Sequence, residues 1–299
     1  MKTDRFHFIQ KNRKVCSGGR RLNYNLIPSG EVVTKWGMPR KSRIDAPGAL
    51  HHIMFRGIER RKIFRDNKDR DNFLDRLGGV LHESGTTCYA WALIPNHAHL
   101  LLKTGSTPAS KVMQKVLTGH AVYFNSRYRR HGKLFQNRYK SILCQEDAYL
   151  LELIRYIHLN PFRSGVLKDF EKLDTYKYTG HSAIVGKKPR EWQDVSYVLK
   201  LFSKTLLRAR RNYRTFIEKG VEQGHRPDLR GGGLIRSLGG WSTVKKLNSS
   251  AKRIKSDERI LGDGDFVEAT LQQAQEHLES RYDLYSTGLD LQAVASRVG

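Results

Sequence analysis

Two histidines in the segment PNHAHLLL, His97 and His99, are spaced so that both could bind one metal ion. They follow the apolar run CYAWALI and the helix-breaking Pro95, where a β-strand is expected to emerge. Residues two apart on a strand point to the same face of a sheet, so both imidazoles can converge on one ion. An HxH pair alone is a weak signal, because two histidines at this spacing can equally be hydrogen-bonding partners.

A second candidate group lies in ELIRYIHLNP, on a helix predicted over residues 147–160. Glu152, Tyr156 and Asn160 recur every four residues and share one face of that helix, so a tyrosine hydroxyl and an oxygen ligand can face the same point. Tyr156 could also be an ordinary half-buried aromatic residue beside the aliphatic stripe of the helix. Other tyrosines compete for the role of nucleophile: Tyr123, Tyr128, Tyr139 and Tyr149.

A basic and aromatic segment lies between these two groups. Residues 127–140 contain six Lys or Arg and no acidic residue, with aromatic side chains between them. Cations that follow phosphates and rings that stack on unpaired bases are the usual combination for binding single strands, although a solvated helix end with core aromatics would look similar. The nucleic-acid-binding candidates are Arg127, Arg129, Arg130, Lys133, Gln136, Arg138, Tyr139 and Lys140.

Hydrophobic periodicity predicts the elements that must position these groups. Strands are expected over ALHHIMFRGI, CYAWALIPN, HAHLLLK and KLFQNRYKSILC. Helices are expected over residues 67–83, 108–130 and 147–160, the last ended by Pro161. This order predicts an α+β domain with a mostly antiparallel sheet and helices on one face.

Composition changes divide the chain into three expected parts. Residues 1–37 are basic and aperiodic, so we expect a poorly ordered leader, with Met38 as a plausible true start. The central domain spans 38–185, and residues 186–299 form a mostly helical extension with helices over 195–219 and 266–281. A last helix begins shortly before Gly299, which suggests a truncated C-terminus.

The charge balance points to a polyanionic partner. The chain has 54 Lys and Arg against 29 Asp and Glu, a net charge of +25, and cations that displace counterions from phosphates supply most nonspecific nucleic-acid affinity. Three widely spaced cysteines predict neither a disulfide framework nor a cysteine-based zinc site. No apolar run is long enough to span a membrane or to serve as a secretory signal, so we expect a cytoplasmic protein.

Four segments together resemble the single-tyrosine HUH transposases, most closely the REP-associated tyrosine transposases. They are RGIERRKIF at 56–64, ALIPNHAHLLL at 92–102, GKLFQNRYKS at 132–141 and YIHLNPFRSG at 156–165. The resemblance covers about residues 38–185 and implies a ferredoxin-like α+β fold. The stretch DERILGDGDFVEATL is similar to extensions of larger relatives, which often end in a helix-turn-helix.

The resemblance also implies roles for individual residues. His97 and His99 match the paired metal ligands, for Mg²⁺ or Mn²⁺, and Tyr156 matches the nucleophile that forms a 5′-phosphotyrosine intermediate. Asn160 matches the polar residue that completes the metal site, although Gln or Glu is more common there. The implied substrate is single-stranded DNA, with hairpin-forming element ends, and the resemblance leaves both a monomer and a homodimer open.

Three alternatives remain open at this level. A zinc hydrolase could use an HxH pair, but Leu100 to Leu102 supply none of the further ligands that such a site normally needs. A relaxase or replication initiator would share the HUH chemistry, yet such proteins are often larger or carry paired tyrosines. A domesticated nucleic-acid-binding protein could keep the fold without catalysis, and the retention of His97, His99, Tyr156 and Asn160 speaks against that loss.

Overall fold

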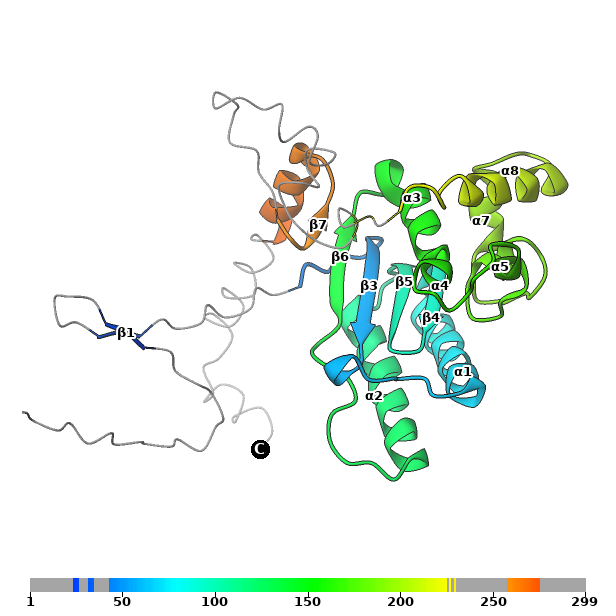
Figure 1. Cartoon of the computed structure of the whole chain (residues 1–299). Coiled ribbons are helices and arrows are strands. Elements are labelled where there is room, and N and C mark those ends of the chain that lie inside the picture. Colours follow the sequence, from blue (N-terminus) through cyan, green and yellow to red (C-terminus); the bar gives the residue numbers. More distant parts are fainter. Residues whose placement is uncertain are drawn as a thin grey trace, which may run out of the picture. The chain divides into compact units, whose positions relative to one another are not determined.

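A five-stranded sheet carries the candidate residues, with strand order β4-β5-β3-β6-β7 (Figure 1). The strands are β3 (Leu50–Arg56), β4 (Thr87–Ile94), β5 (His97–Lys103), β6 (Lys140–Cys144) and β7 (Ile260–Leu261). Neighbouring strands are antiparallel except β6 and β7, which run parallel. This computed structural model describes residues 24–26, 32–34, 43–224, 226, 229 and 257–274.

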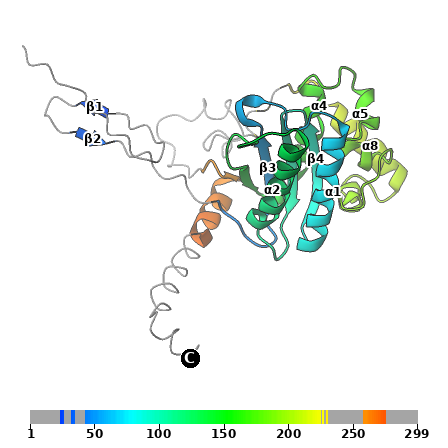
Figure 2. The ribbon, with the colours of Figure 1, turned by 90° about the horizontal axis from the view of Figure 1, so that it is seen from below.

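Helices cover both faces of this sheet. Helices α1 (Asn67–Ser84) and α2 (Ala109–Arg127) pack on one face, where Figure 2 shows them in front of the strands, and α3 (Glu146–His158) packs on the other. The α+β class with a mostly antiparallel sheet is thus confirmed, but the expected placement of the helices on one face is corrected. The reason is that β4 carries buried apolar side chains on both of its faces, so the sheet needs cover on both sides.

The α1–α2 layer is stabilised by capping residues at the ends of α1 and by an apolar stripe that runs along both helices. Asp66 caps α1 by accepting a hydrogen bond from the amide of Asp69 at 3.1 Å, and Gly85 ends the helix in the left-handed conformation with φ of 60°. The stripe packs against the sheet through fully buried side chains of both helices: Phe73, Leu74, Leu77, Met113, Val116 and Phe124. This layer supports the sheet from behind the candidate histidines.

A buried carboxylate joins the ends of α1 and α2. Asp69 is fully buried and accepts hydrogen bonds from the amide of Arg65 at 2.7 Å and the hydroxyl of Tyr128 at 2.9 Å. Arg127 donates to Asp69 at 2.5 Å and also forms two hydrogen bonds with Asp66, at 2.6 and 2.8 Å. The hydrogen bonds from the Arg127 guanidinium lower the pKa of Asp66 to about 2.

Asp69→Ala is expected to lower the free energy of unfolding by about 3–5 kcal/mol, because Arg127 and Tyr128 would lose their buried acceptor. Glu83→Ala is the matched control, since its carboxylate is 63% exposed and pairs with Lys115, an interaction worth about 1 kcal/mol or less. Urea denaturation of both variants measures the difference. Equal losses would contradict a structural role for this buried pair.

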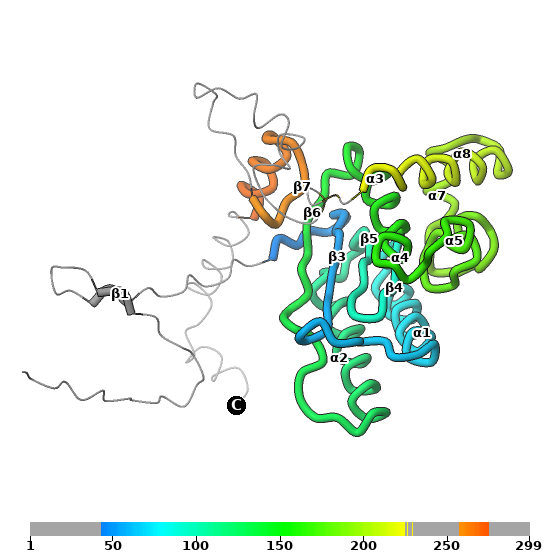
Figure 3. Tube along the Cα trace, viewed as in Figure 1, coloured from blue at the N-terminus to red at the C-terminus, as the bar shows by residue number. Residues whose placement is uncertain are grey.

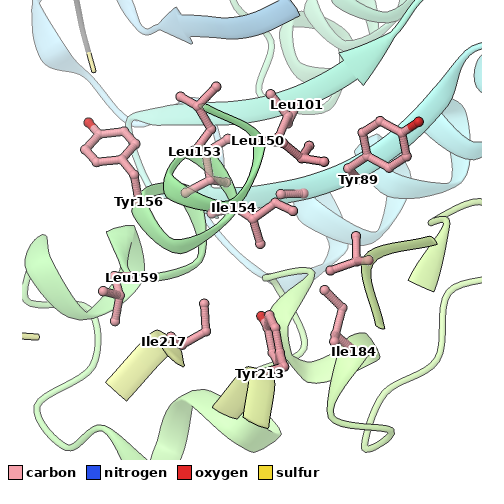
Figure 4. Packing of buried hydrophobic residues seen from close by; sticks show 14 of the residues in the cluster. Tyr89, Leu101, Leu150, Leu153, Ile154, Tyr156, Leu159, Ile184, Tyr213 and Ile217 are labelled. Carbon is pink, nitrogen blue, oxygen red and sulfur yellow. The ribbon is translucent and has the colours of Figure 1, made fainter. Parts of the chain in front are cut away.

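The α3 layer is built from α3 and the helices that follow it (Figure 3). These are α4 (Asn160–Arg163), α5 (Glu171–Thr175), α6 (His181–Ile184), α7 (Val195–Lys200) and α8 (Leu206–Glu218). In Figure 4, Ile154 of α3 lies between Leu101 of the sheet and Tyr213 of α8. The helices beyond residue 185 therefore share one core with α3, and β7 extends the same sheet.

Two predicted elements are shorter in the structure. The helix expected over 195–219 is divided into α7 and α8, because Thr205 is extended, with φ of −99° and ψ of 133°, and caps a new helix. Leu201 and Leu206, the apolar residues on either side of this break, are 45% and 55% exposed. The fourth predicted strand begins only at Lys140, and before it Phe135 makes a single bridge to Gly57.

A buried polar chain connects α3 to α8. Nδ1 of His158 lies 2.7 Å from the hydroxyl of Tyr213, and Nδ1 of His181 lies 3.0 Å from it. Nε2 of His181 lies 2.8 Å from Asp174, which also accepts a hydrogen bond from Arg214. Because Asp174 accepts from His181, the Tyr213 hydroxyl donates to His181 and accepts from His158. Burial lowers the pKa of both histidines.

The thermal stability of the protein is expected to fall as the pH decreases from 7 to 5. A buried histidine with a lowered pKa binds a proton more readily in the unfolded chain, so its stabilising contribution is complete above about 6.5 and is lost below that pH. His181→Gln should flatten the dependence of Tm on pH, measured by circular dichroism. His82→Gln, an exposed change, should not, and an unaltered slope in His181→Gln would contradict this assignment.

The N-terminal residues form a unit of their own, Met1–Ser42. In it β1 (Tyr24–Leu26) pairs antiparallel with β2 (Val32–Thr34), strands that the sequence did not predict within the leader. Met38 and the helix expected before Gly299 lie outside the described residues. Of the helix predicted over 266–281, residues 266–274 are described and are helical, and the helix begins two residues earlier, at 264. Among the described helices, none has the length and apolarity needed to cross a bilayer.

Candidate active site around His97, His99 and Tyr156

The two histidines of β5 lie on the sheet face that α3 covers. Pairing with β3 places His97 opposite Arg56 and His99 opposite Met54. The two imidazole centroids are 5.3 Å apart, with an interplanar angle of 74°. His99 is 1% exposed and His97 is half-buried. The HxH spacing on a strand thus brings both rings to one place, as the alternation of side chains requires.

Asn96 fixes the orientation of the His97 ring. Its amide Nδ2 donates to the carbonyl of Arg60 at 3.2 Å, so its Oδ1 is the atom that lies 2.7 Å from Nδ1 of His97. Because Oδ1 can only accept, Nδ1 of His97 carries the proton and Nε2 is left with a lone pair. A hydrogen bond of this kind orients a histidine for metal binding and sets its tautomer.

His52 belongs to the same group, and the sequence analysis missed it. Its Nε2 lies 3.0 Å from Nδ1 of His99, and its ring centroid is 5.3 Å from that of His99 and 5.8 Å from that of Tyr156. The signal was present, because HH in the first predicted strand puts one of two histidines on the same face as His99. Only the strand pairing shows that His52 is diagonal to His99 in the sheet.

Tyr156 reaches this group from α3. Its ring centroid lies 5.7 Å from that of His99 in an edge-on arrangement, and the residue is 4% exposed. In Figure 4 its hydroxyl points away from the aliphatic cluster of α3. The Arg163 guanidinium lies 5.7 Å from the ring centroid and donates to the carbonyl of Gly220 at 2.9 Å. The predicted tyrosine and the predicted histidines therefore lie together.

The other two residues of that helix face have different contacts. Asn160 is buried, and its Nδ2 donates to the backbone carbonyl of Tyr156 at 2.9 Å, which closes the end of α3. Glu152 forms ion pairs with Arg155 and with Arg226, the latter at 3.2 Å. The structure thus gives Asn160 a helix-capping contact and gives Glu152 a charge-balancing one.

A pocket of about 420 Å³ opens beside the histidines. It is lined by both histidines together with Met54, Phe55, Arg56, Gln136, Asn137, Arg138 and Lys140. Three of the predicted nucleic-acid-binding residues, Gln136, Arg138 and Lys140, therefore border the same space as His97 and His99. All three are exposed, so a polyanion could contact them without displacing the core.

The remaining predicted nucleic-acid-binding residues divide into two groups. Arg129 and Lys133 are exposed, and Arg130 is partly exposed beside the ring of Phe124. Arg127 has another role, because its guanidinium is bound to two carboxylates at the end of α2. Tyr139 is 8% exposed, so it is a core residue rather than a stacking surface.

The competing tyrosines are placed less well for chemistry. Burial, followed by a hydrogen bond to Asp69, raises the pKa of Tyr128 to about 12. Burial also raises the pKa of Tyr139, whose ring is covered by the guanidinium of Arg43 at 3.8 Å. Tyr123 lies 3.4 Å from Arg127, and Tyr149 packs against the α3 core.

The histidine pair fits two positions of a divalent metal site. The fixed tautomer of His97 leaves Nε2 as a ligand atom, and a metal on Nε2 of His99 would leave the proton of Nδ1 facing His52. Within the described residues, no group of three His, Cys, Asp or Glu side chains gathers as a metal site. Oxygen atoms of a bound phosphate, water or Asn160 would have to complete the coordination, which suits Mg²⁺ or Mn²⁺.

Two solved structures are similar in part. One is a REP-associated tyrosine transposase bound to a REP hairpin, with 16% identity and a TM-score of 0.42 over 53% of this chain and 90% of that one. The other, from Deinococcus radiodurans R1, is described as a candidate transposase, with 21% identity and a TM-score of 0.28 over 40% of this chain and 95% of that one. No curated protein matches the sequence.

The sequence itself matches a protein family. The model of the family "Transposase IS200 like" matches residues 47–160. This range contains β3 to β6 and α3, and with them His97, His99 and Tyr156. The helices and the strand that follow lie outside the match. Residues 47–160 of this chain therefore match the family of IS200-like transposases.

Proposed function

We propose that this protein cleaves and rejoins single-stranded DNA through a covalent bond to Tyr156, with a divalent metal bound by His97 and His99. One observation carries the proposal: the rings of Tyr156 and His99 are 5.7 Å apart although they come from different elements. A nucleophile beside a pair of metal ligands is the arrangement that phosphoryl transfer to a protein side chain requires.

The chemistry follows from these positions. The Tyr156 oxygen attacks phosphorus while the bond to the 3′ oxygen breaks, and the proton lost by the phenol is balanced by one that the leaving 3′ hydroxyl gains. The phosphotyrosine keeps the energy of the phosphoester, so a second DNA end can displace Tyr156 without ATP. A metal ion on His97 and His99 would polarise the phosphate and offset charge on its oxygens.

The protein supplies orientation and charge for this step. Asn96 and His52 hold the two imidazoles through hydrogen bonds at 2.7 and 3.0 Å. Asn160 fixes the end of α3 just beyond Tyr156, and its side chain is the proposed third protein contact of the metal. The exposed Arg138 and Lys140 at the pocket would contact phosphates of the bound strand.

Covalent adduct formation tests the proposal. Purified protein is mixed with labelled single-stranded hairpin oligonucleotides, with Mg²⁺, Mn²⁺ or EDTA, and then denatured and separated by electrophoresis. We expect a denaturation-resistant protein–DNA adduct that requires the metal. Binding without an adduct on any hairpin would instead favour a non-catalytic, domesticated DNA-binding protein.

A further inference from the structure

We propose that the Gly57–Lys62 loop binds phosphates of the single strand that adjoins the cleaved phosphodiester. This loop contains the short 3₁₀ turn Ile58–Arg60 and follows β3 directly. It includes most of the RGIERRKIF segment, which takes no part in the proposed cleavage chemistry. The inference rests on the proposed function for the ligand, single-stranded DNA. The location of the site rests on the geometry and charge of the loop itself.

The loop has an unusual backbone conformation. Glu59 has φ of 52° and ψ of 28°, and Arg60 has φ of 60°, so two consecutive residues other than glycine are left-handed. Such residues are uncommon, and a pair of them persists only where the surroundings hold the chain. Gly57 is required at the base, because a Cβ there would lie 2.1 Å from the carbonyl oxygen of Arg61. The loop is therefore a built structure and not a loose connection.

Its anchors join it to the candidate active site. Gly57 donates to the backbone carbonyl of Asn96 at 2.9 Å, and the side chain of Asn96 donates to the carbonyl of Arg60 while contacting His97. On the other side, Ile58 donates to the carbonyl of Leu134 at 3.0 Å. Asn96 thus holds the loop and the His97 ring with one side chain. The loop cannot move far without disturbing the histidine.

The anchors also place the loop beside the pocket. The carbonyl of Arg56, the residue just before the loop, accepts a hydrogen bond from the amide of Gln136 at 3.0 Å. Arg56, Gln136 and His97 all line the pocket. A single strand of DNA bound in the pocket would therefore pass the base of the loop.

The loop presents three cations to solvent. Arg60, Arg61 and Lys62 are all exposed. The one acidic residue of the loop, Glu59, pairs with Arg61 at 2.9 Å, but the two side chains are 66% and 70% exposed, so the pair is weak and a phosphate can replace the carboxylate. The fixed backbone places the Arg60–Lys62 segment beside Asn96, which contacts His97. Exposed cations on such a segment bind a phosphodiester backbone without preference for base sequence.

The test compares two variants that each lose three positive charges. In one, Arg60, Arg61 and Lys62 are changed to Gln, and in the control Lys187, Lys188 and Arg190 are changed to Gln. The control cluster adjoins Thr86 and Thr87, at the end of β4 opposite Pro95 and Asn96. Both triple changes are made with Tyr156→Phe, so that binding is measured without covalent trapping.

The readout is the salt dependence of DNA binding. Fluorescence anisotropy gives Kd over a range of NaCl concentrations for a hairpin with a single-stranded flank and for the same hairpin without it. Three lost phosphate contacts to a single strand should reduce the slope of log K against log [salt] by about 2. We expect this for the loop variant on the flanked hairpin only, with a smaller change in the control variant.

Three results would overturn the inference. The first is an equal slope of log K against log [salt] for the loop variant and the parent, and the second is an equal reduction of that slope in the loop and control variants. The third is the same reduction on the hairpin without a flank, which would place the contacts on the duplex stem. Adduct formation by the otherwise unaltered protein is measured in parallel. An adduct with an unchanged slope defeats the loop inference alone. A reduced slope without any adduct defeats the proposed function and leaves the loop as a DNA-binding element.

Discussion

Tyr156→Phe is expected to reduce formation of the protein–DNA adduct by at least about 10³-fold, because phenylalanine has no oxygen to attack phosphorus. The ring itself remains, and with it the edge-on contacts to His52 and His99. Thermal stability and affinity for a hairpin oligonucleotide should therefore change little. The adduct is measured as the fraction of labelled DNA that migrates with denatured protein.

Tyr149→Phe is the matched control for this variant. Tyr149 lies on the same helix, about two turns before Tyr156, and is partly buried against the α3 core. Its loss should leave the rate of adduct formation within about twofold of the original, the range expected when a residue makes no contact in the transition state. An adduct that survives Tyr156→Phe and disappears in Tyr149→Phe would move the nucleophile.

The second large effect is expected for His97→Ala. Loss of one imidazole ligand removes much of the charge stabilisation that a bound metal supplies, so the rate of adduct formation should fall by at least about 10²-fold. His97 is half-buried, so this change disturbs the core less than a change at the buried His99. Affinity for Mn²⁺, measured by calorimetry or by electron paramagnetic resonance, should fall as well. DNA binding in EDTA should be unaffected.

Asn96→Ala provides an intermediate case. It removes the acceptor that fixes the His97 tautomer, and residues in this position typically change metal affinity or activity by about 10–100-fold. The exposed His82 gives the control, His82→Ala, which should change neither quantity. If His97→Ala keeps both Mn²⁺ affinity and adduct formation, the assignment of the metal ligands is wrong.

The order of strands and helices was predictable because it depends on local patterns. Alternation, apolar runs and the breakers Pro95 and Pro161 placed β3 to β5 and α1 to α3 within a few residues, and they placed the end of β6 at Cys144. The division of the helix near Thr205 was not predictable, since Leu201 and Leu206 continue a helical stripe that tertiary contacts do not use. Coverage of both sheet faces depends on which helix packs where, and periodicity does not encode that.

The candidate site was predictable where two residues belong to one element. His97 and His99 share a strand face, and Asn160 follows Tyr156 by one turn, just beyond the end of α3. The contact of His52 with His99 requires the register between two strands, which only the folded sheet provides. The ion pair of Arg127 with Asp69 also depends on the fold, because the two residues are distant in the sequence. Without that pairing, the sequence indicates a DNA-binding role for Arg127.

The C-terminal helices also affect how the site is held. Tyr213 of α8 receives a hydrogen bond from His158, which is two residues beyond Tyr156 on α3. Arg163 connects the region of Tyr156 to Gly220, at the end of α8. Tyr213, Arg163 and Gly220 lie outside the matched residues 47–160, so the extension contributes to the position of α3.

The central claim is tested most directly by identifying the residue that carries the DNA. The adduct formed with Mg²⁺ or Mn²⁺ is digested with nuclease and protease, and the peptide bearing a nucleotide is sequenced by mass spectrometry. The account predicts a phosphate-linked nucleotide on Tyr156. A nucleotide on Tyr123, Tyr128, Tyr139 or Tyr149, or on a residue other than tyrosine, would contradict it.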